Sequence, residues 1–319
     1  MQRSLLISAC VVTLGCVSLF SCGRSNGSAE VEHTTVVNTE AVPYRPDAAW
    51  NAYWYSGKAE LTSYTLQQNR YGELHSGTAV NIFVTEDFSK AKQVKLDNPG
   101  GAGADKLPVL KLNQSIKFNT GIYPYSLMLS AFQPIDVANY PHAVKLSGSV
   151  QEWCGMAYFQ LNDRNDKFQI VSNSYFESEG DRTVSIEHVL QEDALWNIIR
   201  LQPAALPVGK IDILPGALYL RLAHKDIAPV SAKASITENS GVKTYTVDMP
   251  SLNRTLSIRF ESAFPYRILG WEDSYPGFDG KVLTTKAERN KELILDYWRT
   301  HGNADRVLRE QLGLPKDTQ

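Results

Sequence analysis

The sequence predicts a mainly β fold: a large antiparallel β-sandwich or barrel-like sheet, with one internal helix and two C-terminal helices. Two observations support this prediction. Apolar and polar residues alternate over most of residues 50 to about 181, and the same period of two returns between residues 218 and 260. Such alternation is typical of half-buried strands, whereas apolar residues at helical spacing are confined to three short segments. Many antiparallel strands with few helices favour a sandwich or a closed sheet.

The clearest strand patterns lie in the first half of the chain. One predicted strand places four apolar or β-branched residues on one face: Thr78, Val80, Ile82 and Val84. A long extended stretch follows, in which one parity is shared by Val144, Leu146, Val150, Cys154, Met156 and Tyr158. The polar cluster at residues 163–166 separates it from an alternating run that contains Phe168 and Ile170. We expect these two segments to form a hairpin.

The later strands follow the same rule. Alternating apolar residues predict strands around Leu218–Leu222, Tyr245–Met249 and Leu256–Phe260. The residues Asn239, Ser240 and Gly241 are typical of a tight hairpin turn, because asparagine and glycine tolerate positive φ.

Three segments have helical spacing. Residues 187–200 carry Leu195, Ile198 and Ile199 on one side and end before a proline, which predicts the internal helix. Residues 286–300 predict an amphipathic helix that ends near Gly302. Asn303 is a suitable N-cap for a final helix, and Gly313 is suited to end it.

The N-terminus has the pattern of an export signal. Arg3 is the only charged residue among the first 21, and an apolar run at residues 5–20 follows it. The run is shorter than the roughly 20 residues that span a membrane. It ends in Leu19-Phe20-Ser21-Cys22, which resembles a bacterial lipobox; Gly15-Cys16 is a weaker second candidate. The alternatives are an uncleaved signal and an ordinary secreted protein.

The lipobox resemblance implies a diacylglyceryl thioether on Cys22 and cleavage after Ser21. The predicted organisation is a signal peptide at 1–21, a lipidated cysteine and flexible tether at 22–47, and a β-rich domain with C-terminal helices at 48–319. The membrane would be a partner through the acyl chains, with the outer membrane favoured. Cys154 would be the one free thiol of the mature chain, which leaves no intramolecular disulfide.

The composition excludes several classes of protein. Hydrophobic residues make up 43% of the 319-residue chain, which argues against a disordered protein. The net charge of −2 provides no cationic surface, so nucleic acid is not expected as a partner. Neither a P-loop nor a dinucleotide-binding glycine motif occurs, and we expect no cofactor.

Several segments resemble a group of uncharacterised bacterial envelope lipoproteins. They are Gln68–Glu73, Gly121–Ser126, Gln151–Gly155, Ser174–Asp181 and Pro250–Thr255. Some members of this group are labelled "septum formation inhibitor Maf". True Maf proteins resemble α/β nucleotide pyrophosphatases with a Ser-x-Ser-Pro-Arg-Arg motif, which this sequence lacks. The resemblance therefore implies an envelope lipoprotein without Maf chemistry.

Glu152 and Cys154 form the first candidate polar site. In a regular strand both would point toward the core, where a carboxylate must be paired or protonated. Arg70, Arg221 and Arg254 are the possible partners of Glu152. We expect Cys154 to be a buried, inert thiol, and we expect Glu152 to form a structural ion pair or to turn outward at a bulge, more than to act in catalysis.

The aromatic residues supply a second candidate site. Trp54, Tyr123, Tyr125 and Trp153 are candidates for contact with a sugar or a lipid, although aromatic residues in sheets commonly pack across strands.

Metal binding has weaker support. Glu177, Glu179 and Asp181 could hold calcium, but a solvated turn is the favoured interpretation. The six histidines show neither an HxH nor an HExxH pattern, so the spacing does not indicate a zinc site.

Three functions remain open on these patterns. The first is a lipid-anchored binding or carrier module for an apolar or glycan ligand. The second is a scaffold subunit of a membrane-associated complex, and the third is an envelope hydrolase that uses Glu152 and Cys154. We rank them in that order, because no recognised catalytic motif interrupts the β pattern.

Overall fold

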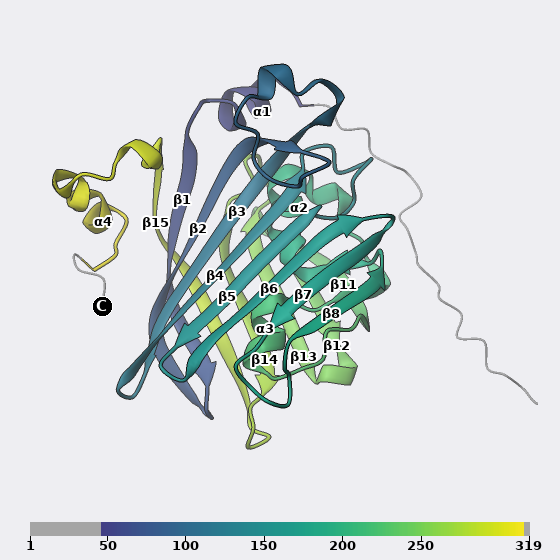
Figure 1. Cartoon of the computed structure of the whole chain (residues 1–319). Coiled ribbons are helices and arrows are strands. Elements are labelled where there is room, and N and C mark those ends of the chain that lie inside the picture. Colours follow the sequence, from purple (N-terminus) through teal and green to yellow (C-terminus); the bar gives the residue numbers. More distant parts are fainter. Residues whose placement is uncertain (1–45, 316–319) are drawn as a thin grey trace, which may run out of the picture. The chain divides into compact units, whose positions relative to one another are not determined.

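The computed structural model describes residues 46–315, which are mainly β, as predicted. Cys22, the signal peptide and the tether as far as residue 45 lie outside the described residues. Figure 1 shows one large sheet, and its strands are β1 (Ala59–Arg70), β2 (Glu73–Ser89), β3 (Lys106–Thr120), β4 (Tyr123–Pro134), β5 (Lys145–Glu152), β6 (Gly155–Arg164), β7 (Lys167–Asn173), β8 (Arg182–Glu187), β9 (Leu190–Gln191), β10 (Gly209–Leu214), β11 (Val230–Asn239), β12 (Val242–Met249), β13 (Arg254–Glu261), β14 (Ile268–Pro276) and β15 (Val282–Leu295). Among these residues, no helix is both long and apolar enough to cross a membrane.

The sheet consists of two meanders that meet at the first and last strands. Its order is β8-β7-β6-β5-β4-β3-β2-β1-β15-β14-β13-β12-β11-β10-β9, and every neighbouring pair is antiparallel except the short pair β9–β10. Most neighbours are consecutive in the chain and are joined by tight turns. The predicted turns at residues 163–166 and 239–241 are confirmed, since Arg164 pairs with Lys167 and Asn239 with Val242.

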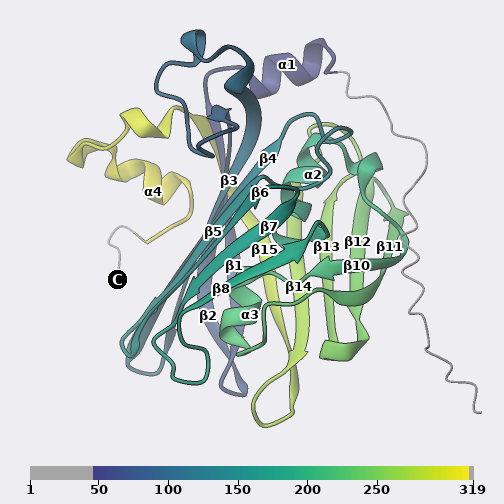
Figure 2. The same cartoon turned by 45° about the vertical axis from the view of Figure 1, so that its right-hand side comes forward.

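The sheet curls around two short helices, α2 (Leu195–Leu201) and α3 (Ala217–Leu222), as Figure 2 shows. Every residue of α2 is buried. On the concave side both helices share one hydrophobic core with strand residues, among them Leu112, Leu129 and Leu161. The alternation identified strands, but it did not always identify the inner face: Val80 and Ile82 lie on the convex side, outside this core. The barrel-like form of the prediction holds in place of a two-sheet sandwich.

A buried ion pair fixes α2 to the sheet. Arg200 Nη2 lies 2.6 Å from Glu60 Oε2, and both side chains are inaccessible to solvent. Tyr53, which lies in α1 (Ala48–Trp54), also donates a hydrogen bond to Glu60. Burial raises the pKa of Glu60, but the positive charge of Arg200 and the hydrogen bonds from Arg200 and Tyr53 together outweigh it and lower that pKa. The Glu60 carboxylate therefore stays ionised inside the core.

Two sequence-based assignments are wrong. Residues 286–295 belong to β15 and form no helix, because β1 pairs along this segment and β14 pairs with its first residues, as far as Glu288. Leu218, Leu220 and Leu222 lie in helix α3, although their spacing indicated a strand. In both cases the tertiary contacts decided between two patterns that a short apolar run satisfies equally well.

The other helical predictions hold in shortened form. The internal helix is α2, which a 3-10 turn at Glu192–Ala194 precedes. After β15, 3-10 turns at Tyr297–Arg299 and Asn303–Arg306 lead into α4 (Val307–Gln311). Gly313 follows α4 at positive φ, as expected for a C-terminal glycine. The N-cap of the Asn303 turn is Gly302, so Asn303 is its first residue and not its cap.

The two edges of the sheet come together at one point. Strand β8 ends at Glu187 and β9 begins at Leu190, yet β8 and β9 are the opposite edges of the sheet order. Three residue steps span at most about 11 Å, so the sheet must curl until its edges nearly meet there. We call this point the seam.

Candidate ligand-binding site

Three hairpin turns bring most of the predicted site residues to one end of the sheet. They connect β1 to β2, β3 to β4 and β5 to β6, and alternate turns of a meander lie at the same end. We define the tip cluster as Arg70, Tyr71, Tyr123, Tyr125 and Trp153. Its hydrogen bonds and ring contacts cross all three hairpins.

Arg70 is at the centre of the tip cluster. Its guanidinium is buried, donates to the carbonyl oxygen of Leu222 over 2.5 Å and lies 4.3 Å from the centre of the Tyr71 ring. The Tyr71 and Tyr125 hydroxyls are 2.8 Å apart. Among the described residues, no salt bridge joins Arg70 to a carboxylate, so the aromatic faces supply much of its stabilisation.

The three tyrosine hydroxyls form a connected set. Tyr123 donates to Tyr71 over 3.2 Å. Burial would raise the pKa of Tyr71, but the hydrogen bonds from Tyr123 and Tyr125 and the positive charge of Arg70 outweigh it and lower that pKa. Burial and the bond to Tyr71 raise the pKa of Tyr125. Of the three hydroxyls, that of Tyr71 therefore loses its proton most readily, and its side chain is half exposed at the turn.

Trp153 gives the cluster an exposed flat surface. Its side chain is 66% exposed and stacks on Tyr123 with ring centres 6.1 Å apart. Tyr175 packs directly over Gly155, where any added Cβ would lie 2.7 Å from the Tyr175 ring. Other large exposed side chains near these turns are Tyr71, Ile122 and Phe278. An exposed aromatic surface of this kind marks an interaction site.

A charged group borders the tip cluster at the end of α3. Arg221 Nη1 and His224 Nδ1 both contact Glu179 Oε1, at 3.4 and 2.5 Å. Burial lowers the pKa of Arg221, the negative charge of Glu179 raises it and the positive charge of Arg70 lowers it again, with a net decrease. Its buried Nε has no hydrogen-bond partner in the described structure. Arg221 therefore has one unsatisfied donor, which a ligand could reach only if the side chain turned toward solvent.

A shallow groove continues from Arg221 between α3 and the concave side of the sheet. It encloses only about 50 Å³, so a bound molecule would lie along it and not inside it. Three cationic side chains line it with apolar strand residues, and the lining consists of Gly148, Ser149, Val150, Ala157, Tyr158, Phe159, Ser172, Glu179, Arg182, Ala217, Leu218, Leu220, Arg221, Lys225 and Ile227.

Glu152 and Cys154 do not lie where the sequence indicated. Glu152 pairs with Gly155, so Trp153 and Cys154 form a two-residue turn in what the parity suggested was one long strand. Cys154 is exposed, and the prediction of a buried thiol is wrong. The Glu152 carboxylate accepts the backbone N–H of Cys154 over 2.7 Å and raises the pKa of the thiol. Glu152 is half exposed and makes no salt bridge with Arg70 or Arg221 among the described residues.

Two other predicted residues serve the core. Trp54 is buried beside Phe83 and Arg200. Arg254 is buried against Glu192 and Asp273 and lies 3.8 Å from the centre of the Tyr219 ring. Both are therefore far from solvent. Glu177 is exposed in the loop after β7, as expected, whereas Glu179 of the same loop is half buried in the contact with Arg221.

A second space lies on the convex side of the sheet, beneath the C-terminal segment. It is a cavity of about 320 Å³ between α4 and strands β1, β2 and β15. Its lining is largely apolar: Leu61, Val80, Ile82, Leu293, Leu295, Leu308, Leu312 and Leu314, with polar residues such as Lys117 and Asp305 around it. Most of these apolar side chains are only partly buried, so α4 covers the strands without filling the space.

Sequence reasoning missed Tyr71 and His224 as members of the site, and it assigned Glu179 to a solvated turn. Tyr71, Glu179 and His224 join it only because the sheet curls and α3 ends beside the hairpin turns. The one local signal was Tyr71 followed by Gly72, both at positive φ, which marks the turn but not its neighbours.

A comparison with solved structures gives a match of low similarity. A solved structure, the β-barrel-like protein of the domain of unknown function DUF1849 from Brucella abortus, is similar with a TM-score of 0.43 and 9% sequence identity, over 75% of this chain and 98% of that chain. The chain matches no protein-family model and no curated protein. The chemistry of the site therefore rests on its own residues.

Proposed function

We propose that this protein is a lipid-anchored binding module of the bacterial cell envelope, and that the tip cluster binds an anionic glycan. The export signal and the lipobox-like Cys22 support the location. A binding role is supported because aromatic rings, tyrosine hydroxyls and arginines converge on an exposed end of a rigid sheet.

The stacked pair of Trp153 and Tyr123 beside Arg70 and Arg221 is the observation that supports this ligand. A flat, exposed aromatic ring suits the apolar face of a sugar, and the hydroxyls of Tyr71 and Tyr123 can bond to its polar edge. The unpartnered Nε of Arg221 suits a carboxylate or phosphate on the same ligand. Side chains of this kind carry much of the energy of known interfaces.

The glycan proposal is tested by co-sedimentation of the purified full chain with peptidoglycan sacculi, an insoluble anionic glycan, and with chitin, a neutral one. We expect binding to sacculi, and we expect Trp153→Ala to weaken it at least about fivefold, because an exposed stacking residue at a hot spot contributes more than 1 kcal/mol. Trp298→Ala is the matched control, since Trp298 is also exposed but lies in the C-terminal segment. Equal binding of wild type and W153A would contradict the proposal.

The cavity beneath α4 supports a second candidate function, the carriage of an apolar chain. Its volume of about 320 Å³ lies in the range of small-molecule sites, and most of its apolar lining residues are leucines. Leu308 lines it from α4, whereas the neighbouring Val307 is exposed and is not part of the lining.

A fluorescent fatty acid tests this second candidate. We expect Leu308→Trp to fill the cavity and lower the affinity of the full chain for the probe at least about tenfold, since the added ring takes the space of the chain. Val307→Trp should leave the affinity unchanged. If L308W and V307W bind the probe equally, the cavity does not carry it.

The hydrolase alternative is not favoured by the geometry of Cys154. A nucleophilic cysteine requires a lowered pKa, and the Glu152 carboxylate raises that of Cys154. The scaffold alternative would use the same exposed aromatic end, and a protein partner captured there in place of the glycan would support it.

A further inference from the structure

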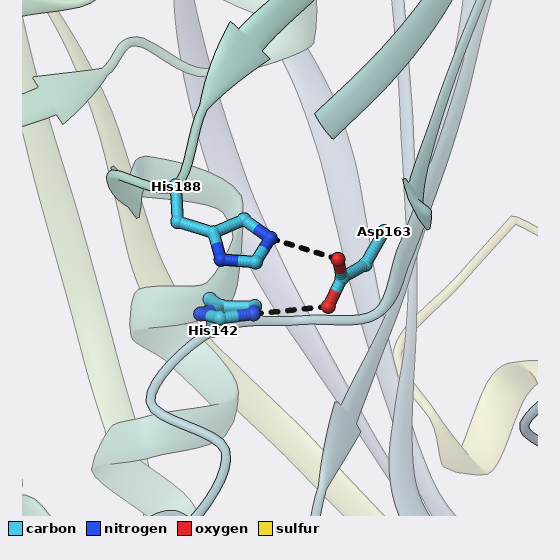
Figure 3. A group of neighbouring side chains, drawn as sticks. All are labelled: His142, Asp163 and His188. Atoms are coloured by element: carbon cyan, nitrogen blue, oxygen red, sulfur yellow. Dashed lines mark hydrogen bonds and ion pairs between the residues drawn. The ribbon is translucent and has the colours of Figure 1, made fainter. Parts of the chain in front are cut away.

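Two histidines and an aspartate converge at the seam, away from the tip cluster. His142 lies between β4 and β5, Asp163 near the end of β6, and His188 in the two-residue connection from β8 to β9. Figure 3 shows both imidazole rings directed at the two oxygens of the Asp163 carboxylate. His142 Nε2 is 3.0 Å from Oδ2, and His188 Nε2 is 2.8 Å from Oδ1.

We propose that His142, Asp163 and His188 bind one divalent transition-metal ion of the Zn²⁺ type. Two imidazoles and one carboxylate form a ligand set that zinc accepts, at bond lengths of about 2.0–2.2 Å. A tetrahedral ion at that distance holds its ligand atoms about 3.4 Å apart. One ligand atom from each of the three residues lies within 4.8 Å of the other two, so an ion can enter with small rotations of the side chains.

The backbone around Asp163 is fixed in advance. Its N–H donates to the carbonyl oxygen of Val144 over 2.9 Å, and its own carbonyl oxygen accepts from Gln93. In the described structure, the Asp163 carboxylate forms salt bridges only with the two histidines, so neither lysine nor arginine competes with a metal for it. A preorganised ligand of this kind lowers the cost of binding an ion.

The two rings are held as well. The centres of the two imidazole rings are 4.4 Å apart, and both rings contact the ring of Phe168, which is fully buried. The His142, Asp163 and His188 side chains are 15%, 20% and 33% exposed. An ion could therefore reach the site from solvent, and three protein ligands would leave a fourth position open for water or a substrate group.

The place of the site in the fold gives the metal a role. The three ligands come from the β4–β5 connection, from β6 and from the short link between the two edge strands. An ion bound to all three would tie the link to the sheet and hold the edges of the curled sheet together. Metal binding would then stabilise the folded state, with a free energy that grows with the logarithm of the affinity.

The test uses the full chain, purified in detergent with a non-histidine tag and stripped with a chelator. Calorimetric titration with Zn²⁺ is expected to show one equivalent bound, and Co²⁺ is expected to give the intense visible bands of a four-coordinate site. His188→Ala and Asp163→Asn should each weaken Zn²⁺ binding at least about tenfold, the smallest loss expected from a disturbed site. His301→Ala, which removes an exposed histidine elsewhere, is the matched control.

A second measurement protects the test against misfolding of the variants. Excess Zn²⁺ should raise the melting temperature of wild type and of H301A but not that of H188A or D163N. No saturable Zn²⁺ binding by the wild type would overturn the proposal. Unchanged binding by H188A and D163N would also overturn it, and the trio would then be a hydrogen-bonded structural network.

Discussion

Asp193 shows at the scale of one residue how burial couples stability to pH. Its side chain is buried beside α3 and accepts the backbone N–H of Ala217 over 2.9 Å. Burial, followed by the negative charge of Glu192, raises the pKa of Asp193 to about 7. The neighbouring Glu192 is paired with Arg254. Asp193 is therefore protonated in mildly acidic solution and acquires an unpaired buried charge as the pH rises.

The raised pKa of Asp193 predicts a loss of stability with increasing pH. Between about pH 4 and pH 7 the folded state holds a proton on Asp193 that the unfolded state has released. The contribution of Asp193 to the free energy of unfolding therefore falls across that window, by a few kcal/mol. We expect Asp193→Asn to flatten the decline, as measured by urea denaturation at several pH values. Asp97→Asn, at an exposed position, is the control. A slope identical in D193N and wild type would show that Asp193 does not titrate in this range.

The Cys154 turn supplies a second prediction at the residue scale. Because the Glu152 carboxylate raises the pKa of the exposed thiol, Glu152→Gln should increase the thiolate fraction and the rate of alkylation at pH 8. The rate is followed by mass spectrometry of the peptide that contains Cys154. Glu177→Gln, an exposed carboxylate in a nearby loop, should leave the rate unchanged. A slower reaction in E152Q would contradict the assigned hydrogen bond.

At the scale of elements, hairpins were predictable where both parity and turn chemistry pointed the same way. The β6–β7 and β11–β12 turns have asparagine or serine at positive φ, and their sequences indicated this directly. The β5–β6 turn was missed because Trp153 and Cys154 carry no turn signal, and because the apolar Met156 happens to continue the parity of β5. In the structure the two-residue turn reverses that parity: Val150 is buried in β5, whereas in β6 Phe159 is buried and Met156 is exposed.

The predicted helix at residues 286–300 shows where the local pattern is ambiguous. Residues 286–295 carry charges at spacings that suit an exposed helix, yet their cross-strand ion pairs account for those charges equally well. Arg289 pairs with Glu261 on β13, and Lys286 pairs with Glu272 on β14. The choice between helix and strand depended on β1 and β14 being available as neighbours, which no local window contains.

At the scale of the whole sheet, residue types were predictable and their meeting points were not. The sequence identified Arg70, Tyr123, Tyr125, Trp153 and Arg221 as candidates. Three adjacent turns bring the first four to one end of the sheet, and the end of α3 places Arg221 beside them. His142, Asp163 and His188 escaped detection because each comes from a different segment: two connections and strand β6. They meet only when the sheet curls to its seam. Long-range curvature is set by accumulated twist and not by local spacing.

The pairing of β1 with β15 has a consequence for the order of folding. Ala59 pairs with Leu295, so the ladder that joins the two meanders links nearly the two ends of the described chain. Each meander consists of local hairpins that can form as the chain emerges, but β1 keeps one unpaired edge until the last strand arrives. An exported chain would thus expose that edge throughout its passage across the membrane. The interval before β15 docks is therefore the period in which this protein is most open to aggregation and to a chaperone.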